Sequence, residues 1–168
     1  MTIKEAFFNW ILKTIMNSPT FNHFLNNKMT QFYENESLKI ARIWGSKERV
    51  SLGENIHLNN VLMNTVSGNI TIGNNTFLGH NVSLLTGTHN IHKKGLERQN
   101  DVPNCGRDIM IGESVWIASN AMIIGPCTIG DYSVIGANSY VTGDIEANAF
   151  YAGSPAKKIK QIRVDNAI

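Results

Sequence analysis

The chain has 168 residues, of which 42% are hydrophobic and 17% charged, and its formal net charge at pH 7 is +2. These values are typical of a soluble protein with one main domain and a short extension. A charge this small, with no basic stripe interleaved with aromatic residues, argues against nucleic acid as a partner. Cys105 and Cys127 are too few for a disulfide framework, and no apolar run reaches the roughly 18 residues of a membrane span.

The beginning of the chain has a helical pattern. Thr2 and Glu5 are spaced as a capping box, and apolar residues follow at helical spacing over residues 7–16. Pro19 is expected to end this helix, because proline cannot continue one. A second helix is expected over about residues 20–34.

We assign residues 1–49 to an N-terminal helical cap. Its apolar face is expected to cover the first coil of the domain that follows, whose edge would otherwise be exposed. Attachment to a membrane surface is the alternative, although Lys4 and Lys13 are few cations for a lipid-binding helix. The first five residues lack the basic-then-apolar layout of a signal peptide, so the expected localisation is cytoplasmic.

Isoleucine, leucine or valine recurs every six residues through most of the chain after residue 50. This period fits neither a 3.6-residue helix nor one alternating strand, but it fits a solenoid of short strands and corners. The apolar residue of each unit points inward, and Gly, Asn or Asp occupies the corners. Cys127 falls on a second inward position of the repeat and is expected in the core. The longest series is Ile111, Ile117, Ile123, Ile129, Ile135 and Val141.

The repeat is interrupted once. Leu84 and Ile111 are 27 residues apart, which is not a multiple of six. The stretch between them is polar and charged and has no period, and we assign a loop to residues 90–107. The solenoid is therefore expected over residues 50–162, followed by a tail over residues 163–168. An excursion from a rigid scaffold is a common place for functional residues.

Four motifs in order connect the chain with a known family. Over about residues 50–162 the chain resembles the hexapeptide-repeat acetyltransferases, in the branch of the galactoside, maltose and polysaccharide O-acetyltransferases. The resemblance implies a left-handed parallel β-helix, a homotrimer with active sites between subunits, and acetyl-CoA as acyl donor with no metal. The motifs are Thr-Gly-Thr-His-Asn-Ile-His at 86–92, Ile-Gly-Glu-Ser-Val-Trp-Ile-Ala-Ser at 111–119, Val-Ile-Gly-Ala-Asn-Ser-Tyr-Val-Thr at 134–142 and Ala-Gly-Ser-Pro-Ala-Lys at 152–157.

The resemblance assigns the catalytic base to His89. A sugar hydroxyl is a poor nucleophile at neutral pH, and a neutral imidazole can accept its proton as it attacks the thioester. Direct transfer is expected, because the sequence contains no nucleophile elbow. By the same resemblance, the backbone N–H of Ser119 stabilises the oxyanion. His92 is placed in the acceptor site, with a surface position as the alternative.

Seven residues match the positions at which the family contacts CoA. Trp116 is expected to flank the pantetheine or the acceptor, with packing between subunits as the alternative. Gly143 stands where the family often has lysine, so the contact there is either missing or made by the main chain alone. Lys157 and Lys160 replace arginines that would meet the CoA phosphates, although a solvated end of the chain is the alternative. The positions are Trp116, Ser119, Ala137, Thr142, Gly143, Lys157 and Lys160.

The residues that would recognise the acceptor are less clearly marked. Asn59 lies thirty residues before His89, which is the spacing of an acceptor-binding asparagine in sugar-acetylating relatives. Asn64 is a rival for this role, and a corner position is the structural alternative for both. Ser67 stands where relatives have an acidic sugar contact, so recognition is expected to differ from that of galactosides or maltose.

The sequence therefore predicts an acetyl-CoA-dependent O-acetyltransferase that acts on a sugar hydroxyl in surface polysaccharide or glycan assembly. The alternatives are an acetyltransferase for a xenobiotic or a serine-like acceptor, and a non-catalytic β-helix scaffold. A zinc enzyme similar to the γ-carbonic anhydrases would need three histidine ligands. His80 and His89 could supply two, but the third has no counterpart at the expected place.

Overall fold

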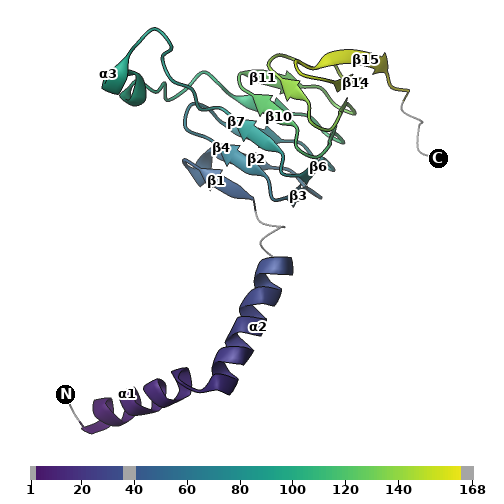
Figure 1. Ribbon diagram of the computed structural model, residues 1–168. Coiled ribbons are helices and arrows are strands. Elements are labelled where there is room, and N and C mark those ends of the chain that lie inside the picture. Colours follow the sequence, from purple (N-terminus) through teal and green to yellow (C-terminus); the bar gives the residue numbers. More distant parts are fainter. Residues whose placement is uncertain (1–2, 36–40, 164–168) are drawn as a thin grey trace. The chain divides into compact units, whose positions relative to one another are not determined.

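The computed structural model describes residues 3–35 and 41–163, and the chain divides into two compact units (Figure 1). The first unit lies within residues 1–38 and the second begins at residue 39. The first contains two helices, and the second is a solenoid of fifteen short strands with one helix in a long connection.

The first unit contains α1 (Ile3–Met16) and α2 (Pro19–Asn35). Before α2, the Ser18 hydroxyl accepts a 3.5 Å hydrogen bond from the Phe21 N–H, and proline is the first residue of α2. This is a favoured N-terminus, because the missing proline N–H would have had no partner in the helix. The expected capping role of Thr2 lies outside the described residues.

Large apolar side chains of α1 are exposed within this unit, and the rings of Phe7 and Trp10 stack with centroids 6.1 Å apart. Their cover of the first coil, expected from the sequence, stays a prediction. Over the described ranges 3–35 and 41–163, the helices are too short or too polar to cross a bilayer. The exposed side chains are Phe7, Phe8, Trp10, Leu12, Ile15 and Met16.

The second unit is built from three sheets that form the faces of a prism, and their strands are parallel except for the last strand of sheet C. Sheet A contains β1 (Arg42–Trp44), β4 (Leu62–Asn64), β7 (Ser83–Leu85), β10 (Met122–Ile124) and β13 (Tyr140–Val141). Sheet B contains β2 (Val50–Leu52), β5 (Ile70–Ile72), β8 (Ile109–Ile111) and β11 (Cys127–Ile129). Sheet C contains β3 (His57–Asn59), β6 (Phe77–His80), β9 (Trp116–Ile117), β12 (Val134–Ile135), β14 (Ala149–Ala152) and β15 (Lys157–Gln161).

Stacked aliphatic side chains form the core of the prism. Ile72 pairs with Ile111, and Ile111 pairs with Ile129 in the next coil. In each of these three-residue strands the outer two residues are buried and the middle one is exposed. The six-residue period thus corresponds to one strand and one corner. The predicted left-handed parallel β-helix is confirmed, and it makes about six turns.

Asparagine accounts for most corners that require a left-handed backbone. Asn55 and Asn75 have φ of 54° and 58° and stack, with the Asn55 amide donating to the Asn75 amide oxygen at 3.1 Å. Asparagine tolerates this conformation better than other residues with a side chain. The remaining non-glycine residues of this kind are Asn60, Asn81, Ser114, Asn120, Tyr132, Asn138 and Asn148.

The β-helix begins earlier than residue 50, which corrects the predicted boundary. β1 pairs in parallel with β4, and Ile43 packs against the core between two exposed neighbours. The short 3-10 helix η1 (Lys47–Arg49) then leads into β2. The first coil lacks the six-residue spacing, because η1 lengthens its corner, so the repeat could not reveal it.

The long connection between β7 and β8 contains the helix α3 (Gly95–Asn100), which lies outside the stack of strands (Figure 1). At its base the Arg107 Nε–H donates to the carbonyl of Thr86 at 2.7 Å. The Arg107 N–H donates to the carbonyl of Ser67 at 3.2 Å. These bonds close the excursion, so that β8 resumes the parallel register with β5.

Strand β15 runs antiparallel to β14 and ends sheet C. It pairs Lys160 with Phe150 and Lys157 with Ala152. The return strand covers the last parallel edge, which would otherwise leave backbone groups unpaired. The lysine-rich end expected from the sequence is thus held as a strand against the solenoid.

Candidate active site

His89 lies in the long connection, four residues after β7 ends, and its side chain is exposed. The ring nitrogen Nδ1 lies 2.9 Å from the carbonyl oxygen of Arg98. A carbonyl can only accept a hydrogen bond, so this contact requires the proton to be on Nδ1. The neutral ring then carries its lone pair on Nε2, the arrangement that a general base needs.

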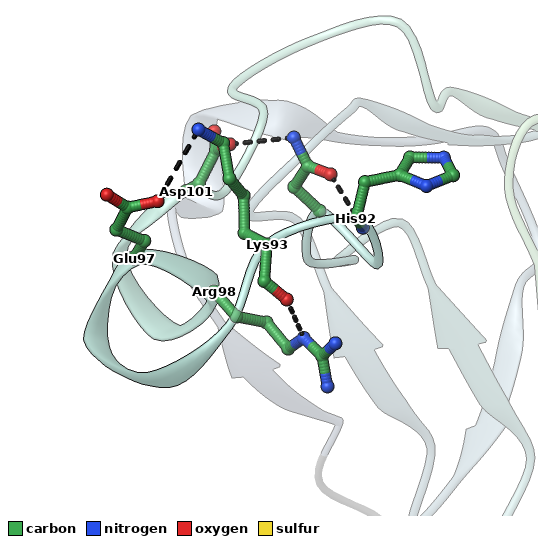
Figure 2. Close-up of polar contacts among 6 residues, drawn as sticks. His92, Lys93, Glu97, Arg98 and Asp101 are labelled. Carbon is green, nitrogen blue, oxygen red and sulfur yellow. Dashed lines mark hydrogen bonds and ion pairs between the residues drawn. The ribbon is translucent and has the colours of Figure 1, made fainter.

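Side chains of the connection hold Arg98 in the position where its carbonyl meets His89. The Arg98 guanidinium donates to the carbonyls of Lys93 at 2.7 Å and Ile91 at 3.1 Å. Figure 2 shows the first of these bonds beside the 3.5 Å ion pair between Lys93 and Glu97. These two bonds hold the segment from Ile91 to Arg98 together, next to His89.

Asn90 makes a second set of contacts next to the histidine. Its amide donates to the Asp101 carboxylate at 2.8 Å, and its N–H donates to the Asp101 carbonyl at 3.1 Å. Its side-chain oxygen accepts from the His92 N–H at 3.0 Å. In Figure 2 the His92 ring points away from Arg98, Glu97 and Asp101. The structure therefore assigns the backbone of His92, and not its ring, to the architecture of the loop.

His89 opens into a cavity of about 450 Å³. Its walls come from the outer surface of sheet A and from the long connection. Trp44 from β1 and Asn64 from β4 line it together with Gly87, His89 and Val102. We call this space the His89 cavity. Its size lies within the roughly 300–1,000 Å³ typical of small-molecule sites.

A second and larger cavity, of about 690 Å³, lies on the outer surface of sheet C. Trp116, Val134 and Phe150 form an apolar floor, and the Trp116 ring stacks on Phe77 with centroids 5.9 Å apart. Lys160 also lines it, so the cavity combines an apolar surface with a positive charge. We call it the Trp116 cavity. It contains Trp116, Ala137 and Lys160 of the predicted cofactor residues.

Ser119 follows the end of β9 by two residues and presents a backbone N–H between two coils. Its neighbours Ala118 and Asn120 donate their N–H groups to the carbonyls of Ile135 and His80, whereas the Ser119 N–H donates to none within the described residues. A side chain at Gly79 would lie 2.6 Å from this nitrogen. Glycine at position 79 thus keeps space in front of the predicted oxyanion donor.

The other predicted cofactor residues do not line the Trp116 cavity. Thr142 and Gly143, which follow β13, line a separate cavity of about 180 Å³. Lys157 is exposed at the start of β15 and lines none of the five main cavities. Its neighbour Lys158 bonds to Glu146, and this contact raises the pKa of Lys158. Lys160 is therefore the lysine of this strand that faces the Trp116 cavity.

The residues predicted to bind the acceptor separate in the structure. Asn59 lies on sheet C, donates to the carbonyl of Leu78 at 3.0 Å and lines a different cavity from His89. Ser67 is fully buried, so it cannot contact an acceptor. Asn64, the rival considered for the role of Asn59, lines the His89 cavity. The burial of Ser67 corrects its prediction, whereas the role of Asn59 as an acceptor contact stays a prediction.

Two residues of the cavities were missed from the sequence. Arg163 lines the Trp116 cavity beside Lys160, and it stands in the segment assigned to a tail. The sequence could have indicated Arg163, because Lys157, Lys160 and Arg163 are cations spaced three residues apart. Trp44 lines the His89 cavity but precedes the six-residue repeat, so the period gave it no role.

The cysteines have the environments expected of them. Cys105 is exposed in the long connection, and Cys127 is buried in β11. Burial, and then the nearby Asp144, raises the pKa of the Cys127 thiol to about 12. A thiol with this pKa stays protonated at neutral pH, so Cys127 is a core residue and not a nucleophile.

No group of three or more histidine, cysteine, aspartate or glutamate side chains could hold a metal ion within the ranges 3–35 and 41–163. His80 and His89 are the histidines considered for a zinc site, and His80 lies on β6 of sheet C.

Known proteins that are similar to this chain include enzymes with the same repeat and the same fold. Residues 108–143 match the family model described as bacterial transferase hexapeptide, six repeats. The structure of a maltose O-acetyltransferase from Clostridium difficile 630 is 31% identical in sequence with a TM-score of 0.57, covering 75% of this chain and 68% of that one. This chain belongs to the hexapeptide-repeat acetyltransferase family.

Other members of the hexapeptide-repeat acetyltransferase family are similar over most of this chain. Galactoside O-acetyltransferase from Escherichia coli K12 is 37% identical over 113 residues, which are 67% of this chain and 54% of that protein. A structure of galactoside acetyltransferase in complex with coenzyme A has a TM-score of 0.66 and 29% identity, over 90% of this chain and 78% of that one. The chain spans about half the length of the curated relatives that it matches first.

Proposed function

We propose that this protein transfers the acetyl group of acetyl-CoA to a hydroxyl group of a sugar. The observation that carries the proposal is the bond between His89 Nδ1 and the Arg98 carbonyl, which leaves the lone pair on Nε2 at a small-molecule cavity. The sugar acceptor is supported by the similarity to galactoside and maltose O-acetyltransferases. The proposed setting is surface polysaccharide or glycan assembly in the cytoplasm.

In the proposed reaction His89 Nε2 accepts the proton of the sugar hydroxyl as the oxygen attacks the thioester carbonyl carbon. The resulting tetrahedral intermediate carries negative charge on the former carbonyl oxygen, which the Ser119 N–H stabilises. When the intermediate collapses, the C–S bond breaks and the protonated His89 returns its proton to the CoA thiolate. The products are an O-acetyl sugar and CoA.

The Trp116 cavity is the proposed site of the CoA moiety. Its apolar floor suits the pantetheine chain, and the lining residues Lys160 and Arg163 suit phosphate groups. The structure of a relative with bound coenzyme A supports this choice of donor. Residues Thr142 and Gly143 lie at a smaller neighbouring cavity and are proposed to contact the donor only through their backbone.

A complete site is proposed to need two subunits. The His89 cavity lies on sheet A, and the Trp116 cavity lies on sheet C, a different face of the prism. The two share no lining residue, so we infer that His89 of one subunit faces the Trp116 cavity of the next. A closed homotrimer would create three such sites.

Mixing two inactive variants tests this arrangement. A His89→Ala chain lacks the base, and a Lys160→Glu, Arg163→Glu chain should repel the CoA phosphates. When the two are co-expressed in equal amounts, about a quarter of the wild-type activity should return, because random assembly places an intact base opposite an intact cavity in that fraction of sites. Activity that stays at the level of the separate variants would mean that each subunit contains its own site.

The cations of the Trp116 cavity give a second prediction. Lys160→Ala with Arg163→Ala should raise the KM for acetyl-CoA more than it lowers kcat, because phosphate contacts act equally in ground and transition states. Added salt should weaken acetyl-CoA binding by the wild type in the same way. Initial rates over a range of acetyl-CoA concentrations measure both effects.

Lys157→Ala is the matched control, since Lys157 is on the same strand but lines none of the main cavities. It should leave the KM for acetyl-CoA unchanged. If Lys157→Ala raises this KM and the Lys160, Arg163 double variant does not, the phosphates bind at the start of β15 and not at the Trp116 cavity.

The acceptor class itself is tested by a screen for CoA release. Acetyl-CoA is supplied with sugars, with chloramphenicol and with serine, and the free thiol is measured. Sugars should give rates well above the background hydrolysis of the thioester. Release with serine or chloramphenicol, and none with any sugar, would replace the proposed acceptor class.

A further inference from the structure

Trp44 ends β1, and its side chain is 70% exposed. Ile43 packs against the core, so the alternation of the strand places Arg42 and Trp44 on the outer surface of sheet A. Single exposed apolar residues are common in proteins and need no explanation. The significance of Trp44 therefore depends on what surrounds it.

The register of sheet A brings Trp44 into line with the connection that carries His89. Trp44 pairs with Asn64, and Asn64 pairs with Leu85, the last residue of β7. Neighbouring strands are about 4.8 Å apart, so Trp44 stands about 10 Å along the sheet from the strand that leads to His89. Both side chains line the His89 cavity.

Asn64 supplies an oriented polar group between these two residues. Its side-chain oxygen accepts a 3.0 Å hydrogen bond from the Val66 N–H. This bond fixes the orientation of the amide, so Nδ2 is left as a donor. A side chain at position 87 would lie 2.6 Å from Nδ2, and Gly87 leaves this space open.

Among the described residues, the part of the His89 cavity that one subunit supplies carries no acidic side chain, lysine or arginine beside Trp44 and Asn64. An amino acid acceptor would bring a carboxylate and an ammonium group, which bind poorly without opposite charges. A neutral sugar has no such requirement. One face of a pyranose ring carries C–H groups with partial positive charge, which pack favourably on the negative face of an aromatic ring.

We propose that the indole of Trp44 is the platform on which the ring of a neutral pyranoside acceptor stacks, with Asn64 Nδ2 donating to one of its hydroxyls. This assignment rests on the proposed acetyl-transfer function. It makes Trp44 the residue that selects a ring over an open-chain alcohol, while His89 acts on whichever hydroxyl reaches Nε2.

The test compares ring and open-chain acceptors in three forms of the full-length protein. Wild type, Trp44→Phe and Trp44→Leu are assayed with the methyl glycosides of galactose, glucose and N-acetylglucosamine, and with glycerol. Trp44→Leu should lower kcat/KM for the best glycoside about tenfold, mainly through KM, whereas Trp44→Phe should retain most of it. Glycerol, which has hydroxyls but no ring, should react equally with all three proteins.

Equal losses for glycosides and glycerol in Trp44→Leu, or no loss for either, overturn the proposal. A change in oligomeric state, measured by size-exclusion chromatography with light scattering, also overturns it, because Trp44 would then serve packing between chains. Retention of the glycoside rate in Trp44→Leu but not in Trp44→Phe would likewise contradict stacking on an aromatic face.

A binding measurement separates this inference from the proposed function. The indole N–H signal of Trp44 is identified in an NMR spectrum of the nitrogen-labelled protein by its loss in Trp44→Phe. One of the three methyl glycosides should shift this signal in the absence of acetyl-CoA, and glycerol should not. If no acceptor is acetylated but the signal shifts, the proposed function fails and the platform stands. If transfer occurs and the signal does not move with any glycoside, Trp44 is not the platform.

Discussion

Replacement of His89 by alanine is expected to lower kcat for acetyl transfer by roughly 10²-fold or more. In the proposed reaction the imidazole accepts the hydroxyl proton, and alanine would leave this step to water. The side chain is exposed, so the fold and the affinity for acetyl-CoA should persist. Thiol release at saturating acetyl-CoA measures kcat, and calorimetric titration of the same variant measures binding of the donor.

His92→Ala provides the control, because His92 belongs to the same loop and its ring points away from the contacts around Arg98 (Figure 2). Its backbone N–H, which bonds to Asn90, is retained in the variant. Turnover should stay within about twofold of the wild type, as for a residue outside the reacting groups. A large loss in His92→Ala, with near-normal turnover in His89→Ala, would exchange the roles of the two histidines.

Ile72→Ala is expected to lower the free energy of unfolding by about 2–5 kcal/mol. Ile72 is 1% exposed and stacks between Leu52 and Ile111 of the neighbouring coils. The parallel backbone ladder on both sides keeps these coils from closing the space, so a cavity should remain. Denaturant unfolding followed by circular dichroism measures the change.

The neighbouring Thr71 points outward from the same strand and supplies the control. Thr71→Ala should change the free energy of unfolding by no more than about 0.5 kcal/mol, as at most surface positions. Equal losses in the two variants would contradict the assignment of alternate residues of β5 to the core and the surface.

The regular coils of the solenoid could be predicted because their period is a local property of the chain. In the coil after the long connection, strand partners in all three sheets are 18 residues apart, as in the pairs Ile109 and Cys127, Trp116 and Val134, and Met122 and Tyr140. The first coil could not be predicted in this way. η1 interrupts its corner, and the inward Ile43 has no partner at six-residue spacing.

The predicted acceptor residues show what counting along the chain leaves open. Asn59 has the spacing of the family's asparagine, but it belongs to β3 and sheet C. Asn64 is next to the connection that carries His89 because it pairs with Leu85 across sheet A. Spacing along the chain predicts proximity only when the coils between two residues have the same length as in the relatives.

The orientation of His89 depends on a group that the sequence does not reveal. Its partner is a backbone carbonyl, and any residue at position 98 would supply one. The contribution of Arg98 is to bind two other carbonyls and so to position its own. The motif around His89 therefore predicts a base at this position, and the structure adds the contact that sets the tautomer of its ring.

Direct transfer from acetyl-CoA to a sugar hydroxyl is the central claim, and a single turnover with radiolabelled acetyl-CoA tests it. The best methyl glycoside of the acceptor series is mixed with excess protein, and the label is followed in the sugar and on the denatured protein. We expect the label to appear in an O-acetyl sugar, at a rate that falls with His89→Ala, and never on the protein. Label that first accumulates on the protein, or that reaches no sugar while free acetate forms, would contradict the account.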